Sequence, residues 1–320
     1  MAMPARVQLL TDTVMAAHAA PGHPERPERL GAVADGVADG AMAAGVELER
    51  PTVVPAADDD LLRVHSPWFL DALEAAADRG GGWIDGDTYV GPDSVRAMRA
   101  AAGATIQAAR AVMGGAAPVA FAVVRPPGHH ASGERAAGFC LVNNVALAVE
   151  ALRADGIADR VAIVDWDVHH GDGTQAIFEA DADLFYASTH QSPLYPGTGA
   201  PEESGSGEAV GTKRNVTLPP GSGDDAFVTA WRELLLPELE RFAPAALLVS
   251  AGYDAHRDDP LAHLEVSEAG YGAVAREIGA LATRLGLPGV ALTLEGGYDL
   301  AALRASAAAT VRGLLEGLEA

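Results

Sequence analysis

Apolar residues recur every three or four positions in several stretches of the chain, which is the spacing of an amphipathic helix. A clear example spans residues 93–112. A helix is also expected to begin at Pro27, and another after Ser66, because Ser followed by Pro is a favoured N-cap and first-turn pair. Further helices are predicted over residues 225–242, with an interruption at Pro237, and over residues 267–285 and 300–318.

Between these stretches lie short runs that are almost continuously apolar, as expected for strands buried on both faces. Their alternation with helices predicts an α/β fold with a mostly parallel sheet covered by helices. Residues 197–211 are loop-like and rich in Gly, Ser, Pro and Glu, but no linker divides the chain, so a single domain over residues 1–320 is expected. The predicted strands are residues 119–124, 161–165, 184–188, 246–250 and 290–294.

The composition argues against several classes of protein. With 49% hydrophobic and 21% charged residues, this chain of 320 residues is expected to fold around a sizeable core. Its one cysteine, Cys140, rules out an intrachain disulfide framework and cysteine-based zinc fingers. The formal charge of −22 argues against nucleic-acid binding, which needs a basic face. It is compatible with a cationic substrate, although solubility is the simpler explanation.

Neither a membrane span nor a targeting segment is expected. Residues 111–124 form an uncharged apolar stretch of about fourteen residues interrupted by two glycines and a proline, whereas a membrane span needs about 20. Near the start of the chain, Asp12 interrupts an apolar stretch that is too weak for a signal peptide. We therefore expect a cytoplasmic protein that does not associate with membranes.

Polar residues follow four of the predicted strands. The segments are RPPGHH (residues 125–130), DWDVHHGDG (165–173), AGYD (251–254) and EGGYD (295–299). In open parallel sheets, ligands bind beyond the carboxyl ends of the strands. Four such ends that carry His, Asp and Tyr therefore predict one composite site.

The second of these segments has the spacing of a metal site. In an extended chain, side chains alternate between faces, so Asp165, Asp167 and His169 would project to one side. Two ligands two residues apart, together with Asp254 from another strand end, would give three Asp or His ligands and leave a fourth position for water, as in catalytic zinc sites. The alternative is that these residues cap loops and turns. It is less favoured because several acidic and His residues are packed together directly after an apolar strand.

Two further groups suggest proton transfer and oxyanion stabilisation. His129 and His130 follow a Pro-Pro-Gly sequence that favours a sharp turn, and histidine is the natural proton carrier near neutral pH. Tyr298 follows two glycines, and its hydroxyl could donate a hydrogen bond to a developing oxyanion. Each feature also fits a purely structural role, as a partly buried His pair and as a Tyr in a turn.

Together, these segments resemble the motifs of the zinc-dependent histone deacetylase family, which includes acetylpolyamine amidohydrolases and bacterial deacetylase-like proteins. The motifs run from residue 22 to residue 299, so the resemblance covers nearly the whole chain. GHPERPERL (22–30) resembles class II and polyamine-type members rather than class I. The other motifs are RPPGHHA (125–131), GFCLVNN (138–144), VDWDVHHGDGTQ (164–175), YPGTG (195–199), SAGYDAHRDDPL (250–261) and EGGYD (295–299).

This resemblance implies the arginase–deacetylase fold, in which helices flank a central eight-stranded, mostly parallel sheet. It also implies a zinc-dependent amidohydrolase that removes an acetyl group from the amine of acetyl-lysine in proteins or peptides. One Zn²⁺ ion would be bound by Asp167, His169 and Asp254. The implied catalytic residues are His129 and His130, backed by Asp165 and Asp172, with Tyr298 polarising the substrate carbonyl.

The resemblance further implies an acyl-lysine channel and a second cation site. Phe139 and Tyr195 match the aromatic walls of that channel, with Gly138 beside Phe139, while Leu261 matches its apolar rim and Asp87 falls near the acidic residue that grips the substrate backbone. A monovalent cation such as K⁺ would bind largely through backbone carbonyls near Asp165, Asp167, His169, Ser188 and Thr189.

Several alternatives stay open at this level. The substrate could be an acetylated polyamine instead of acetyl-lysine. The chain could also be a manganese ureohydrolase on the same fold, although the His pair after Pro-Pro-Gly has no role there. A non-catalytic protein that senses an acyl ligand is a third alternative, although the metal ligands, both histidines and Tyr298 are intact. A homo-oligomer is equally compatible with the sequence, because polyamine-type relatives use a dimer to narrow the entrance.

Overall fold

The computed structural model describes residues 6–320; residues 1–5, which open the segment considered for targeting, lie outside the described part. Eight strands form one sheet in the order β2-β1-β5-β10-β9-β6-β7-β8, and all neighbouring pairs run parallel. These strands are β1 (Arg6–Leu10), β2 (Glu47–Glu49), β5 (Val119–Ala122), β6 (Val161–Asp165), β7 (Leu184–Gln191), β8 (Lys213–Leu218), β9 (Ala246–Ala251) and β10 (Val290–Leu294). A separate antiparallel hairpin pairs β3 (Gly82–Trp83) with β4 (Tyr89–Val90).

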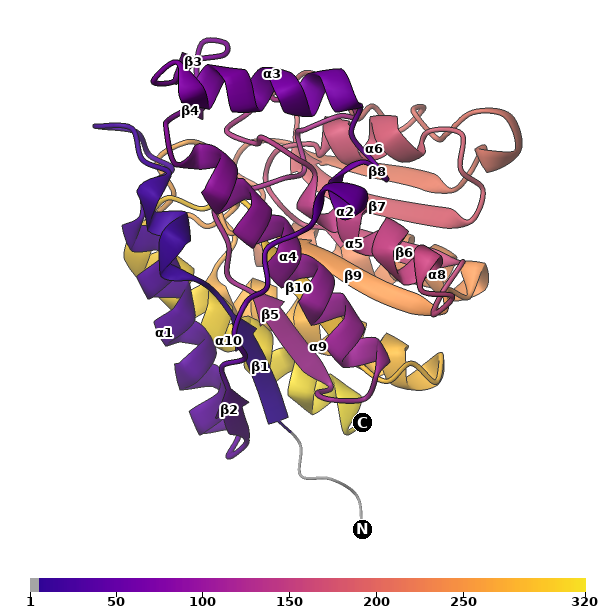
Figure 1. Ribbon diagram of the computed structural model, residues 1–320. Coiled ribbons are helices and arrows are strands. Elements are labelled where there is room, and N and C mark those ends of the chain that lie inside the picture. The colour runs from indigo at the N-terminus through magenta and orange to yellow at the C-terminus, as the bar shows by residue number, and fades with distance from the viewer. Residues whose placement is uncertain (1–5) are drawn as a thin grey trace.

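Helices cover both faces of the sheet (Figure 1). On one face, α4 packs on β1, β5 and β10, and α5 lies beside it; on the other, α10 packs between α1 and α9. The longer helices are α1 (Glu28–Ala43), α3 (Pro67–Asp78), α4 (Ser94–Met113), α5 (Asn144–Ala154), α9 (Glu268–Arg284) and α10 (Leu300–Leu318). The shorter ones are η1 (Thr13–Ala17), α2 (Asp58–Leu61), α6 (Asp172–Phe178), η2 (Gly207–Ala209), α7 (Asp224–Thr229), η3 (Ala230–Leu235) and α8 (Leu236–Phe242).

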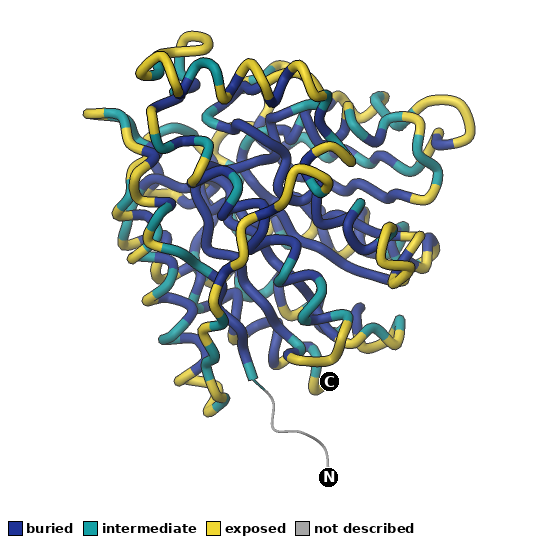
Figure 2. The backbone as a smooth tube through the Cα atoms, viewed as in Figure 1, coloured by how far each residue is buried: buried dark blue, intermediate teal, exposed yellow. Residues whose placement is uncertain are grey.

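The five strands predicted from the sequence are confirmed as β5, β6, β7, β9 and β10. All their residues are buried, so the backbone tube through the middle of the sheet is dark blue in Figure 2. In the eight-stranded sheet, the strands without a prediction are β1, β2 and β8, and the hairpin strands β3 and β4 have no prediction either. In the edge strand β8, buried positions are interrupted by partly exposed ones, and β2 has only three residues, so neither produces a continuous apolar run.

The predicted helices are present, but two local details differ from the expectation. The stretch predicted to be interrupted at Pro237 is helical throughout; its hydrogen-bond pattern changes earlier, in the π-helical turn η3, and Pro237 lies in the first turn of α8. Ser66 is the N-cap residue of α3, but within residues 6–320 its hydroxyl has no hydrogen-bond partner. Across that same range, the structure has no helix of the length and apolar character needed to cross a bilayer.

Glycines allow α1 to approach α10 closely. A Cβ atom at Gly36 would lie 2.3 Å from the Arg304 carbonyl oxygen, and one at Gly40 would lie 2.7 Å from that of Ala308. Both distances are far shorter than van der Waals contact, so the two helix backbones can meet only where the side chain is absent. This close packing fixes α1 against α10 on their face of the sheet.

Sheet order brings the four functional segments together. The strands that precede them, β5, β10, β9 and β6, are consecutive neighbours in the sheet. Because all four run in the same direction, their carboxyl ends lie along one edge. The polar segments that follow these strands therefore meet in one place, as predicted.

Candidate active site

Three side chains that could ligate a metal ion converge beyond the ends of β6 and β9. Single ligand atoms from Asp167, His169 and Asp254 all lie within 4.8 Å of one another. His169 Nδ1 is 3.1 Å from Asp167 Oδ1 and 3.2 Å from Asp254 Oδ2. Strand β6 ends at Asp165, so the regular alternation of an extended strand does not continue through this segment, yet these three side chains still meet.

The surroundings of the three side chains suit a divalent cation. The Gly296 N–H donates to Asp167 Oδ2 at 2.7 Å and the Val168 N–H donates to Asp254 Oδ1 at 2.9 Å, so the other oxygen of each carboxylate faces His169. A Cβ at Gly296 would lie 2.0 Å from Asp254 Oδ2, so the cradle has room only for glycine there. Two fixed carboxylate oxygens and an imidazole nitrogen are a donor set that zinc accepts.

The electrostatics of this cluster favour positive charge. Burial disfavours a charged imidazole, but hydrogen bonds to Asp167 and Asp254 raise the pKa of His169 to about 10. Burial, together with the nearby Asp167 carboxylate, raises the pKa of Asp254 above its ordinary value. Two carboxylates buried this close together repel each other, and a cation between them would relieve that repulsion.

Behind the cluster, each histidine of the pair has its own carboxylate. His129 Nδ1 is 3.1 Å from Asp165 Oδ2, and Tyr186 donates its hydroxyl to the same oxygen at 3.0 Å. His130 Nδ1 is 2.8 Å from Asp172 Oδ1. In each case the carboxylate accepts the Nδ1 proton, which fixes the tautomer and leaves Nε2 for chemistry.

The two histidines differ in their affinity for a proton. Burial, together with the nearby His129, lowers the pKa of His130 to about 3. For His129, burial acts in the same direction, but the Asp167 and Asp165 carboxylates outweigh it and raise the pKa well above the ordinary value. Adjacent rings with opposite shifts are typical of sites that move a proton.

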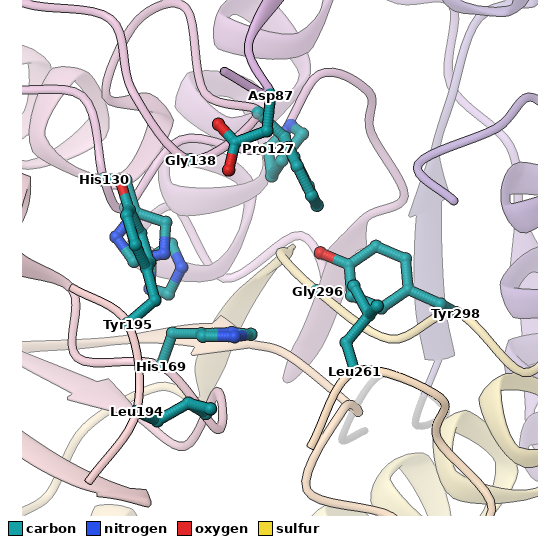
Figure 3. Close-up of a pocket in the computed structure, with 12 residues that line it drawn as sticks. Asp87, Pro127, His130, Gly138, His169, Leu194, Tyr195, Leu261, Gly296 and Tyr298 are labelled. Carbon is teal, nitrogen blue, oxygen red and sulfur yellow. The ribbon is translucent and has the colours of Figure 1, made fainter. Parts of the chain in front are cut away.

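Tyr298 lies across the pocket from the histidines, and its hydroxyl points into the cavity (Figure 3). Its ring meets that of Phe139 edge-on at 5.8 Å. Burial and the negative charge of Asp254 raise its pKa well above the ordinary value, so the hydroxyl keeps its proton at neutral pH. It can therefore act as a hydrogen-bond donor.

These groups line a narrow pocket of about 270 Å³, at the lower limit of the roughly 300–1,000 Å³ found for drug-sized ligands. At Gly138 φ is +52°, and a Cβ there would lie 2.4 Å from the His130 ring, so this position needs glycine. All five residues predicted to bind substrate face the pocket. Its lining consists of Asp87, Pro127, His129, His130, Gly138, Phe139, His169, Leu194, Tyr195, Leu261, Gly296 and Tyr298.

The residues expected at a monovalent cation site lie on β6, on β7 and in the segment that follows β6. Ser188 pairs with Asp165 in the β6–β7 register, and its hydroxyl is 3.0 Å from His190 Nδ1. The hydroxyl of Thr189 accepts a hydrogen bond from the Trp231 indole at 3.1 Å, so its side chain is turned to the other face. Any contribution of Thr189 to that site is therefore limited to its backbone.

Two buried acids were not singled out from the sequence. Glu295 Oε2 accepts the N–H groups of Gly128 and His129 at 2.7 and 3.1 Å. Asp259 Oδ2 accepts the Tyr298 N–H at 2.7 Å. Both acids lie inside the quoted motifs, and the signal that could have identified Glu295 is an acidic residue placed directly between a buried strand and two glycines.

Comparison with known proteins agrees with this geometry. The family profile described as "Histone deacetylase domain" matches residues 23–314. A probable deacetylase of Archaeoglobus fulgidus is 42% identical over 282 residues, which cover 88% of this chain and 77% of that protein.

Two solved structures superpose on nearly the whole chain. The HDA15 HD domain has a TM-score of 0.89 and 38% identity, covering 97% of this chain and 88% of its own. The acetylpolyamine aminohydrolase from Burkholderia pseudomallei has a TM-score of 0.86 and 32% identity, covering 96% and 98%. With its family profile, its eight-stranded parallel sheet and these relatives, the chain belongs to the histone deacetylase family of amide hydrolases.

Proposed function

We propose that this protein is a zinc-dependent deacetylase that removes the acetyl group from acetyl-lysine in proteins or peptides. The observation that carries the proposal is the floor of the pocket, where Asp167, His169 and Asp254 meet beside a His pair and a buried Tyr hydroxyl. Apolar walls above this floor suit an aliphatic side chain with an acetyl group at its tip. An amide at that tip would lie among a metal, a base and an oxyanion donor.

Asp167, His169 and Asp254 would hold the zinc ion. The chemistry that zinc supplies when bound is polarisation of the amide carbonyl and acidification of the attacking water. A monovalent cation such as K⁺ is part of the same proposal, near Asp165 and Ser188, where it would balance the buried carboxylates.

The remaining steps belong to the histidines and Tyr298. His130, with Nδ1–H held by Asp172, would accept the water proton at Nε2 as the hydroxide attacks the carbonyl carbon. Tyr298 would donate its hydroxyl hydrogen to the carbonyl oxygen as negative charge develops there. A protonated histidine of the pair would then pass a proton to the amine nitrogen, because an amine leaves poorly without one.

The pocket walls would hold the substrate chain. The rings of Phe139 and Tyr195 line the cavity. Gly138 has no side chain, which leaves room for the His130 ring beside it. Leu261 would line the apolar rim. At the mouth, the carboxylate of Asp87 would accept hydrogen bonds from the backbone N–H groups of a bound peptide.

An acetylated polyamine is the alternative substrate. An acetylpolyamine amidohydrolase of Burkholderia pseudomallei is 44% identical over 247 residues, and the chain carries a formal charge of −22 that would attract a polycation. Against this, Asp87 is the acidic side chain that lines the described pocket, and the lining residue Leu261 is apolar. A polyamine with several ammonium groups would need more carboxylates than that.

The decisive experiment is acetate release by the zinc-loaded enzyme from an acetyl-lysine peptide, N-acetylputrescine and N-acetylspermidine under identical conditions. We expect a higher kcat/KM for the peptide. A much higher kcat/KM for the polyamines would establish the alternative. Absence of turnover with zinc bound, on all three substrates, would contradict both and favour a protein that only senses an acyl ligand.

A further inference from the structure

The segment HPERPER (residues 23–29) carries a buried ion network that the proposed reaction does not use. Glu25 is 3% exposed, and Arg29 and Arg125 are fully buried. The Arg125 guanidinium contacts both oxygens of the Glu25 carboxylate, with Nη2 2.5 Å from Oε2, and Arg29 Nη1 donates to Oε1 at 2.8 Å. Burial opposes ionisation of Glu25, but the two arginines hold its pKa at about 2, so the carboxylate is charged.

Arg29 extends from this network to the loop that carries Tyr298. Its Nε donates to the Gly297 carbonyl oxygen at 2.6 Å, and its Nη2 donates to that of Glu295. The guanidinium carbon also lies 5.1 Å from the centre of the Tyr298 ring, within the range of a cation–π contact. Every nitrogen of the Arg29 fork is therefore engaged, two on the loop and one on Glu25.

The loop needs such an external support. Tyr298 follows Gly296 and Gly297, and Gly297 has φ of +112°, so the backbone here has more conformational freedom than at other residues. The two carbonyl oxygens that Arg29 binds flank these glycines. A guanidinium is rigid and planar, so fixing one edge against Glu25 also fixes the edges that hold the loop.

We propose that Glu25 is a positioning residue for Tyr298, which it orients through Arg29. The proposal rests on the proposed function, because it assumes that the Tyr298 hydroxyl takes part in catalysis. Glu25 itself does not line the pocket, so it has no contact with substrate. The HPERPER segment would thus support the catalytic hydroxyl rather than recognise the substrate.

Glu25→Gln tests this with little change in shape. The amide keeps one acceptor oxygen but carries no negative charge, and in either orientation its NH₂ group faces a guanidinium, so the anchor of the Arg29 fork is weakened. We expect kcat to fall about 10–100-fold, as when a supporting hydrogen bond behind a catalytic group is removed, with KM changed less than about twofold. The matched control is Glu49→Gln, which also removes a carboxylate bound to an arginine, Arg6, but on the edge strand β2; its kcat should not change.

A double-mutant cycle with Tyr298→Phe separates positioning from loss of fold. Without the hydroxyl there is nothing left to position, so Glu25→Gln should lower kcat less than about threefold in the Phe background. The same 10–100-fold loss in both backgrounds would overturn the proposal, as would unchanged kcat in Glu25→Gln alone. Melting temperature and zinc content by elemental analysis are measured for each variant to confirm a folded, loaded enzyme.

If Glu25→Gln does not fold, Arg29→Lys takes its place in the cycle, because lysine keeps the charge beside Glu25 but lacks the fork. The same thresholds apply to this variant. Failure of the proposed function has a different signature: wild-type enzyme without acetate release, or Tyr298→Phe with unchanged kcat. Either result would overturn the role of Tyr298 and the positioning role of Glu25 with it, whereas an active enzyme that needs Tyr298 but ignores Glu25 overturns the positioning role alone.

Discussion

The floor and the rim of the pocket are built in different ways. At the floor, His129, His130, Asp167 and Asp254 are all 3% exposed or less and lie on segments that follow central strands of the sheet. At the rim, Asp87 and Leu261 come from connecting loops, and Tyr195 is 43% exposed. The sheet therefore holds the reacting groups rigidly, while loops that can vary without disturbing the core determine which substrate enters. Changes at the floor should affect kcat and metal binding, and changes at the rim should affect KM.

Asp254→Ala should have the largest effect, because it removes one of the three proposed zinc ligands at the floor. We expect loss of bound zinc and of detectable turnover, measured by elemental analysis and acetate release. The control is Asp258→Ala four residues on, where the side chain is 66% exposed; it should keep both. Full zinc content in the Asp254 variant would contradict the ligand assignment.

Tyr298→Phe tests the floor of the pocket and leaves the three proposed zinc ligands unchanged. Loss of one oxyanion donor lowers kcat by about 10²–10³-fold, and zinc content should stay complete. Tyr253→Phe is a suitable control, since its hydroxyl is also buried but pairs with Thr310 at 3.2 Å, away from the pocket. A Tyr298 variant with unchanged kcat would remove this residue from the mechanism.

The difference between the central strands and the periphery of the fold also explains which elements could be predicted from the sequence. Central strands buried on both faces leave continuous apolar runs, and the polar residues at their ends stand out against them. For this reason β5, β6, β9 and β10 could be recognised, and with them the segments that meet at the floor. The edge strand β8 begins with Lys213, a buried lysine whose Nζ donates to the carbonyl oxygens of Asp181 and Leu184. No pattern of residue types indicates that such a lysine is inside.

The hydrogen-bond and ion-pair partners of buried acids could not be predicted from the sequence either. Glu295 and Glu25 are acids that a hydropathy pattern assigns to the surface. Both are buried, because backbone N–H groups of a distant segment satisfy Glu295 and the distant Arg125 contacts both oxygens of Glu25. Arg125 lies 100 residues from Glu25 in the chain. Pairings of this kind depend on how the strands are ordered in the sheet, which a single sequence does not display.

A smaller effect is expected at the rim. Asp87→Asn removes a charged acceptor, and loss of one charge-assisted hydrogen bond corresponds to about a tenfold rise in KM for the acetyl-lysine peptide, with kcat changed less than about twofold. The control is Asp71→Asn on the exposed face of α3.

N-acetylputrescine sharpens this measurement because it has no backbone N–H groups. If Asp87 binds a peptide backbone, KM for N-acetylputrescine should not change in the variant. If KM rises for N-acetylputrescine and not for the peptide, Asp87 binds an ammonium group. If kcat falls and neither KM changes, the rim residue acts like a floor residue, which would contradict the division between floor and rim.

The smallest expected effect is on the pH dependence of stability, and it concerns His65, which lies behind the floor of the pocket. His65 is 1% exposed, and its Nε2 accepts the Asn143 N–H at 3.0 Å; Asn143 in turn donates its side-chain amide to the Ala131 carbonyl oxygen at 2.9 Å, directly after the His pair. Burial lowers the pKa of His65 from 6.5 to about 4. A proton at Nε2 would break the bond to Asn143, so the folded state keeps this ring neutral.

The sign of the pH dependence follows from that shift. As pH falls below about 6.5, the unfolded chain takes up the proton first, so stability that is present above that pH is lost on the way down to about 4. Between pH 6 and pH 5 the loss should be about 1 kcal/mol in the free energy of urea unfolding. His65→Gln should reduce the difference between these two pH values by that amount, while His263→Gln, at an exposed position, should leave it as in the wild type. An unchanged pH dependence in His65→Gln would show that folding does not lower the pKa of His65, and would contradict a ring that the fold keeps neutral.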